Sequence, residues 1–205
     1  AVLKIGQDTL TEQLNRLGFG TDIPFDIVMK KSQYENDSGG LGDEITLADS
    51  GYGQGRMLVN PLHMAGMYTA FVNDGKMIRP RLEYEKEQQG GTWVEDAFTP
   101  EAARTVQEDL VQVIENPGGT GHNARIEGIP LAGKTGTAEI KASKEDTSGT
   151  ELGWFNVFTT DPAMENPLLL ISMVEDVKDR GGSGYVVDKT KTVLEQWFRV
   201  SGSVN

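Results

Sequence analysis

The 205-residue chain is 24% charged and 37% hydrophobic, so it holds enough apolar residues to build a core. Its 31 Asp and Glu outnumber 19 Lys and Arg, and the net charge of -12 argues against nucleic acid as a partner, since such a chain repels polyanions. It has no cysteine, and its two histidines are His63 and His122. These counts exclude disulfides and thiolate metal sites, and we expect neither a metal nor a cofactor.

The first part of the chain carries mainly helical patterns. Residues 1–17 predict two short helices separated by Gly6. Residues 30–44 have the polar, glycine-rich composition of a loop. Three glycines between residues 51 and 55 indicate a backbone that turns sharply or lies close to another segment.

Two further helices have clear start signals. Asn60-Pro61 predicts an N-cap followed by a proline in the first turn, and Thr99-Pro100 predicts the same for a helix that ends before Asn116-Pro117. Between them, residues 77–84 predict a short extended piece. His63 falls on the first of these helices, where we expect it to serve packing rather than a site.

The last third carries strand patterns and then a helix. Residues 134–141, 152–159 and 168–177 predict three strands, close enough in sequence to pair antiparallel. A final helix is predicted over 186–200. Helices, then antiparallel strands, then a helix indicate the α+β class.

The predicted strand that contains Lys134-Thr135-Gly136-Thr137 has the residues of a binding site. It places a cation, two hydroxyls and a residue without a side chain next to one another. On a strand, Lys134 and Gly136 point to one face, and Thr135 and Thr137 point to the other. Gly136 leaves room for another backbone alongside. The stretch therefore suits an extended substrate that ends in a carboxylate.

The same stretch also fits the phosphate-binding pattern G-x-x-x-x-G-K-[ST], from Gly128 to Thr135. That site needs free N–H groups and a helix that begins at the lysine. Pro130 lacks an N–H, Gly136 would fall in the first helical turn, and the alternating strand–helix order is missing. A nucleotide-binding protein is therefore a remote alternative.

Lys134-Thr135-Gly136-Thr137 also resembles the third active-site motif of the penicillin-binding proteins and serine β-lactamases. It is followed by Ala138-Glu139 and preceded by Gly51-Tyr52-Gly53-Gln54-Gly55, a helix that starts at Pro61, and Asn73-Asp74-Gly75. That order resembles the class B high-molecular-weight penicillin-binding proteins. It is most similar to the low-affinity Gram-positive branch, which contains the enterococcal and methicillin-resistance transpeptidases.

The resemblance covers nearly the whole chain and implies the C-terminal portion of one transpeptidase domain. That portion would be mainly helical over 1–125, with antiparallel strands and a C-terminal helix over 126–200. The family's nucleophile motif, Ser-x-x-Lys, is absent from the sequence, and no usable Ser-x-Asn is present; Tyr34-Glu35-Asn36 only imitates the Tyr-x-Asn variant from within a polar loop. We expect the nucleophile, its lysine base and the first sheet strands to lie in an N-terminal part outside this chain. The chain alone is then expected to be inactive.

The resemblance implies a D,D-transpeptidase that cross-links peptidoglycan stem peptides through an acyl-enzyme, with β-lactam antibiotics as covalent inhibitors. Lys134 would supply positive potential and assist proton transfer around the second-motif serine. Thr137, and more weakly Thr135, would bind the terminal carboxylate. The backbone N–H of Thr137 would form half of the oxyanion hole. Gly136 would let the substrate pair with the edge of the strand.

Three further residues are site candidates by the same resemblance. Tyr52 and Gln54 would line the cleft, and Glu139 would mark its far end. Packing within loops explains these three residues nearly as well.

Two classes of function remain open at this point. One is the catalytic transpeptidase, and the other is a non-enzymatic module that recognises penicillin, such as a sensor or a scaffold for cell-division partners. For either, the resemblance implies a place on the extracellular face of the bacterial membrane, with an anchor in an N-terminal segment outside this chain.

Overall fold

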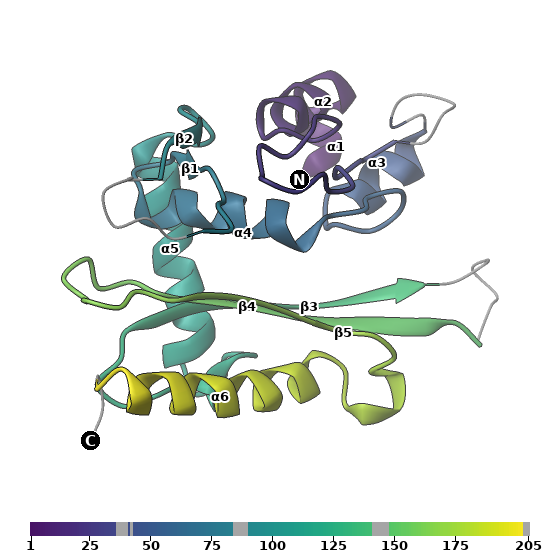
Figure 1. The fold of residues 1–205 in the computed structure, drawn as a ribbon. Coiled ribbons are helices and arrows are strands. Elements are labelled where there is room, and N and C mark those ends of the chain that lie inside the picture. Colours follow the sequence, from purple (N-terminus) through teal and green to yellow (C-terminus); the bar gives the residue numbers. More distant parts are fainter. Residues whose placement is uncertain (36–40, 42, 84–89, 141–147, 203–205) are drawn as a thin grey trace. The chain divides into compact units, whose positions relative to one another are not determined.

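A computed structural model describes residues 1–35, 41, 43–83, 90–140 and 148–202. The chain forms two compact units, Ala1–Ala103 and Arg104–Asn205, and the border falls within the long helix α5 (Pro100–Glu115). The first unit is mainly helical, and the second contains a three-stranded antiparallel sheet (Figure 1). The predicted α+β class is confirmed.

The first unit begins with α1 (Val2–Ile5) and α2 (Gln7–Arg16), which are separated at Gly6 as the sequence predicts. Gly6 has a φ of 84°, a conformation that favours glycine and breaks the helix. The inner face of α2 buries Leu14 in an apolar cluster with Phe19, Tyr34, Leu41 and Leu47.

Helix α3 (Glu44–Ser50) is an element that the sequence analysis missed. Asp43 is its N-cap, since Oδ1 accepts hydrogen bonds from the backbone N–H of Thr46 at 2.8 Å and of Ile45 at 2.9 Å. The bond from Thr46 is the main cause of a lowered pKa of Asp43, because it favours the charged carboxylate. The predicted turn over 51–55 follows directly. The helix has seven residues and directly precedes this glycine-rich turn, so its helical periodicity in the sequence is weak.

Helix α4 (Pro61–Thr69) begins where the sequence predicts. Asn60 Oδ1 accepts a hydrogen bond from Leu62 N–H at 2.8 Å, and Pro61 occupies the first turn. The helix continues into the short 3₁₀ helix η1 (Ala70–Val72).

Strands β1 (Met77–Ile78) and β2 (Thr92–Val94) pair antiparallel. The extended piece predicted over 77–84 is therefore a strand at its first two residues, and its last residue lies outside the described part. Met77 is fully buried and packs in a small cluster with Ala70 and Ala97.

His63 of α4 is fully buried and packs against the rings of Phe19 and Trp93, whose centroids each lie 5.0 Å from the imidazole. Its Nε2–H donates to the backbone oxygen of Leu17 at 2.8 Å, while Nδ1 has no partner among the described residues. Burial lowers the pKa of His63 because the charged ring would lose its water, and the bond to Leu17 opposes this only in part. This environment agrees with the expected packing role.

We predict that the first unit loses stability as the pH falls below 6.5, the value at which an unperturbed histidine titrates. The unfolded chain takes up a proton there, whereas folded His63 takes it up only at lower pH, so acid favours unfolding in this window. Urea unfolding at about pH 7.5 and about pH 5.5 checks this. His63→Gln should remove the effect, and the control His122→Gln should keep it. Equal acid sensitivity in both variants would contradict the prediction.

The sheet of the second unit consists of β3 (Leu131–Ile140), β4 (Thr150–Thr159) and β5 (Leu169–Val174), in that order. β3 and β4 pair antiparallel without interruption, from Leu131 opposite Thr159 to Ile140 opposite Thr150. β4 and β5 are also antiparallel. Three strands with antiparallel pairing are thus confirmed, although β5 ends before the predicted limit at residue 177 and residue 141, the predicted end of the first strand, lies outside the described residues.

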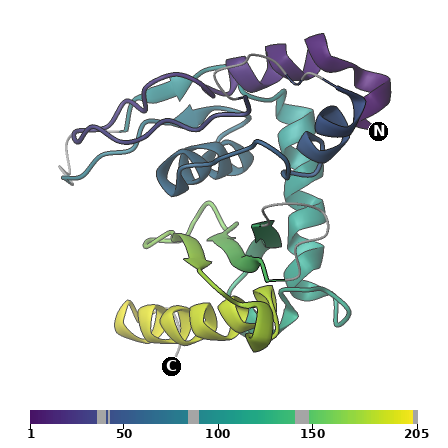
Figure 2. The same ribbon diagram turned by 90° about the vertical axis from the view of Figure 1, so that its right-hand side faces the viewer.

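Helix α6 (Ser183–Val200) lies along one face of this sheet (Figures 1 and 2). It follows the 3₁₀ helix η3 (Lys178–Arg180) and includes the whole predicted range 186–200. The core between helix and sheet also takes in the end of α5, and its large buried side chains are Ile114, Leu131, Phe155, Val157, Val186, Val187, Leu194 and Phe198. This packing fixes the sheet, including the strand that carries residues 134–137.

Candidate active site

Residues 134–137 lie in the middle of β3, between its buried start and its exposed end. No helix begins at Lys134, because the strand runs on to Ile140. The phosphate-loop hypothesis is therefore wrong, since its phosphate would be bound at a helix N-terminus.

One face of β3 lies against the core of the second unit. A Cβ added at Gly133 would lie 2.8 Å from the backbone oxygen of Asn156 and 3.2 Å from Cε2 of Phe155. There is no room for a side chain at this position. By strand alternation, Thr135 and Thr137 share this face.

The opposite face is more open. A Cβ added at Gly136 would meet the Cβ of Trp154 at 3.6 Å, an ordinary van der Waals contact, and no other described atom within 4 Å. Packing within the unit therefore does not require glycine here. Lys134 lies on this same face, as the sequence predicts.

β3 is an edge strand: β4 pairs with it on one side, and no strand of the described residues pairs with it on the other. Thr160 N–H donates to the backbone oxygen of Pro130 at 3.1 Å, which makes this a hydrogen-bonded pair at the start of the ladder. In an uninterrupted antiparallel ladder, hydrogen-bonded and non-hydrogen-bonded pairs alternate. Thr135 and Thr137 therefore direct their backbone N–H and C=O groups toward the outer edge.

Lys134 brings its charge to this edge. Its side chain is exposed, and Nζ donates to the backbone oxygen of Thr135 at 2.7 Å. Because that oxygen points outward from the sheet, the ammonium lies at the edge rather than in the core. A carboxylate that approached the edge of β3 would meet a positive charge.

The two threonines of the motif differ in exposure. Thr135 is 7% exposed, and its Oγ1 lies 2.7 Å from that of Thr120. Thr137 is exposed, and its Oγ1 lies 3.5 Å from where a Cβ on Gly182, at the start of α6, would be. The hydroxyl of Thr137 is thus the more accessible of the two.

The other three predicted site residues are Glu139, Tyr52 and Gln54, and each has a neighbour that is close in sequence or on the paired strand. Glu139 is exposed near the end of β3, directly opposite Glu151 of β4. Tyr52 and Gln54 belong to the first unit, in the turn after α3. The Tyr52 hydroxyl donates to Asp49 Oδ1 at 2.8 Å, and Gln54 N–H donates to the backbone oxygen of Asp49 at 2.9 Å. A role for these residues in lining a cleft stays a prediction.

Thr120 is the residue at this site that sequence analysis missed. It lies in the loop 116–125 between α5 and β3, which the sequence indicates only as a helix stop. The position of Thr120 between two glycines, upstream of the motif strand, was the available signal for a functional residue. The sequence spacing could not predict, however, that Thr120 contacts Thr135 on that strand.

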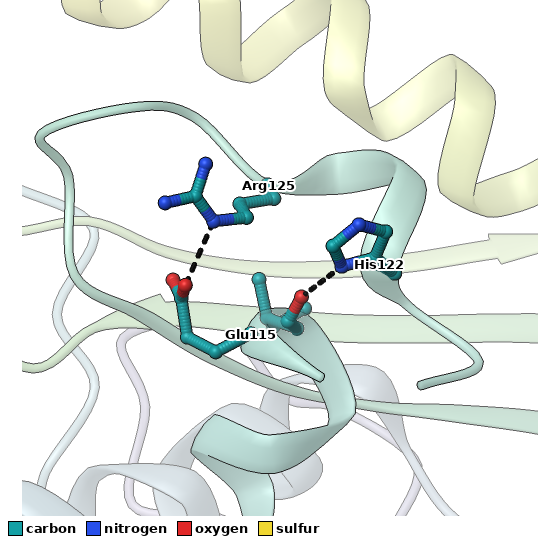
Figure 3. A network of polar contacts seen from close by, with 4 residues as sticks. Glu115, His122 and Arg125 are labelled. Atoms are coloured by element: carbon teal, nitrogen blue, oxygen red, sulfur yellow. Dashed lines mark hydrogen bonds and ion pairs between the residues drawn. The ribbon is translucent and has the colours of Figure 1, made fainter. Parts of the chain in front are cut away.

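The same loop is tied to the end of α5 by two side chains (Figure 3). His122, at the start of the 3₁₀ helix η2 (His122–Ala124), donates from Nδ1–H to the backbone oxygen of Ile114 at 2.8 Å. Arg125 Nε pairs with Glu115 Oε2 at 2.7 Å, and this carboxylate raises the pKa of Arg125. Both contacts hold the loop against the helix that precedes it.

Across the described ranges, no group of three or more His, Asp or Glu side chains is placed to hold a metal ion. Among the helices of those same ranges, none combines the length and the apolar composition needed to span a membrane.

Comparison with known proteins matches residues 1–195 to the family described as penicillin binding protein transpeptidase domain. Penicillin-binding protein 3 of Bacillus subtilis is 42% identical over 189 residues, which cover 92% of this chain and 28% of that protein. A probable peptidoglycan D,D-transpeptidase of Pseudomonas aeruginosa is 30% identical and is matched over 88% of this chain and 30% of its own length. The chain thus spans less than a third of either relative.

Solved structures agree with these sequence matches. The D,D-transpeptidase domain of a peptidoglycan glycosyltransferase from Eggerthella lenta superposes with a TM-score of 0.73 at 26% identity, covering 99% of this chain and 50% of that one. The transpeptidase domain of penicillin-binding protein 3 from Burkholderia pseudomallei gives a TM-score of 0.76 at 21% identity, over 97% of this chain and 59% of that one.

Proposed function

We propose that the full-length protein is a peptidoglycan D,D-transpeptidase, because this chain belongs to the penicillin-binding protein transpeptidase domain family. It would act through an acyl-enzyme on a serine outside these 205 residues and would be inhibited covalently by β-lactams. The observation that supports this best is the edge strand β3, which carries Lys134 and Gly136 on its open face and directs the backbone of Thr137 outward.

The open edge of β3 suits an extended peptide that adds itself as a further strand. Thr135 and Thr137 offer outward backbone groups to such a peptide, and Gly136 leaves its path clear. Lys134 and the exposed hydroxyl of Thr137 then attract and bind the terminal carboxylate. Thr135, which is 7% exposed, would bind the carboxylate more weakly than Thr137.

The backbone N–H of Thr137 would act on the carbonyl under attack. Directed toward the edge, it can donate to the oxygen that becomes negative in the tetrahedral intermediate. One donor of this kind typically contributes about 3–4 kcal/mol to the transition state. As the family resemblance implies, Tyr52 and Gln54 would line the cleft and Glu139 would mark its far end.

The remaining parts of the machinery would come from the rest of the protein. No serine of this sequence has a lysine three residues later, so the nucleophile and its base would be supplied by another segment. That segment would also carry the second-motif serine and the membrane anchor that places the enzyme on the outer face of the cell. Peptidoglycan stem peptides are its proposed substrates.

Labelling of the full-length protein with a fluorescent penicillin tests this proposal. We expect stoichiometric acylation, and after proteolysis the label should be found by mass spectrometry on a serine outside residues 1–205. A label on a peptide from within these residues would contradict the assignment.

A transpeptidation assay with stem peptides separates the enzyme from the non-enzymatic alternative. The proposed function requires cross-linked product that penicillin suppresses. Acylation without any cross-linked product would instead identify a β-lactam sensor or scaffold.

A further inference from the structure

Thr120 and Thr135 form a hydroxyl pair that the proposed roles leave unexplained. Their Oγ1 atoms lie 2.7 Å apart across 15 residues of sequence. Thr135 is buried on the strand that carries Lys134, whereas Thr120 is exposed on the loop 116–125. The pair therefore connects a surface loop to the motif strand.

The backbone around Thr120 is fixed against the end of α5. On one side, a Cβ on Gly119 would overlap the backbone oxygen of Val113. On the other side, Gly121 N–H donates to that same oxygen at 3.1 Å. The two contacts of Figure 3 anchor the residues that follow. The position of Thr120 is thus fixed by the contacts between its loop and the end of α5.

The direction of the hydrogen bond decides what Thr135 can offer a ligand. A threonine hydroxyl has one proton to donate and lone pairs that accept, while a carboxylate only accepts. If Thr135 donated to Thr120, it would turn its lone pairs to the carboxylate. If Thr120 donates instead, Thr135 keeps its proton for the ligand, and the bond it accepts strengthens its own donation.

We infer that Thr120 is a positioning residue for carboxylate recognition: it donates to Thr135 Oγ1 and so orients the Thr135 hydroxyl as a donor. This inference rests on the proposed function, because it adds a determinant to the same site. The ligand is the terminal carboxylate of a stem peptide or of a penicillin that replaces it.

Substitutions at Thr120 in the full-length protein test the inference, with the second-order rate of acylation by a labelled penicillin as the readout. Thr120→Val keeps the shape and removes the donor, so we expect a rate about 5- to 20-fold lower. Thr120→Ser restores the hydroxyl and should stay within about threefold of the parent. The matched control is Thr192→Val on α6, which should leave the rate unchanged. Thr192 is exposed, and its Oγ1 donates to the backbone oxygen of Asp188 in the same helix at 3.4 Å.

Combination with Thr135→Val distinguishes positioning from general support. If Thr120 acts through Thr135, the double variant is acylated no more slowly than Thr135→Val alone. Losses that multiply in the double variant, or a Thr120→Val rate equal to that of the parent, would overturn the inference. Failure of the parent protein itself to react with penicillin would instead count against the proposed function.

Discussion

Lys134→Ala in the full-length protein is expected to lower the rate of acylation by a labelled penicillin by at least about 100-fold, the scale seen when a preorganised electrostatic group is removed from an active site. The side chain is exposed, and its hydrogen bond goes to the outward-facing oxygen of Thr135, so the core does not depend on it. The melting temperature and the near-UV circular dichroism should therefore stay at the parent values. The loss belongs to the site and not to the fold.

Two further variants sharpen this test. Lys191→Ala removes a half-exposed lysine of α6, whose Nζ lies 4.0 Å from Glu195 Oε1, and it should change neither rate nor stability because such surface pairs contribute little. Lys134→Arg keeps the charge but not the compact ammonium, so it reports how much of the effect is positive potential alone. Undiminished labelling of Lys134→Ala would refute the role of this residue.

Gly136→Ala should separate activity from stability. The new Cβ would meet Trp154 at 3.6 Å, an ordinary contact, so the free energy of unfolding should change by no more than about 0.5 kcal/mol. On the open face of the edge strand, however, the methyl group would narrow the space beside the edge at which a substrate backbone is proposed to pair. We expect transpeptidation to fall at least about tenfold, which corresponds to a barrier higher by about 1.4 kcal/mol.

Gly133→Ala is the matched control for this substitution, three residues earlier on the same strand. There the Cβ would lie 2.8 Å from the backbone oxygen of Asn156, and the strand or its neighbour must shift. Overpacking of this kind costs about 1–3 kcal/mol, which denaturant unfolding would detect. If Gly136→Ala destabilised the protein as much as Gly133→Ala, or left transpeptidation unchanged, the open face would have no functional meaning.

Elements with strong local signals were predicted well. The cap at Asn60, the cap at Thr99 before α5, the break at Gly6 and the alternation of β3 all depend on residues within a few positions of one another. The structure confirms them, and at Thr99 the side-chain Oγ1 accepts a hydrogen bond from Ala102 N–H at 3.2 Å. Helix α3 was missed although Asp43 caps it, because a short helix beside a glycine-rich turn leaves a weak periodic signal.

At the candidate site, too, the features that depend on local sequence were predictable. Side chains alternate between the two faces of a strand with a period of two residues, so the shared face of Lys134 and Gly136 on β3 could be predicted from the sequence. Thr120 could not be found this way, because its partner Thr135 is brought to it by the packing of a loop against a strand.

The sequence by itself thus determined the family motif, its strand and the face of each motif residue, because these depend on local chain geometry. Only the tertiary structure decided that β3 is an edge strand with the backbone of Thr137 directed outward, since this depends on the pairing with β4. It also decided which hydroxyl is accessible. Thr135 is buried beside Thr120 while Thr137 lies exposed near Gly182, and these neighbours come from distant parts of the chain that pack together only on folding.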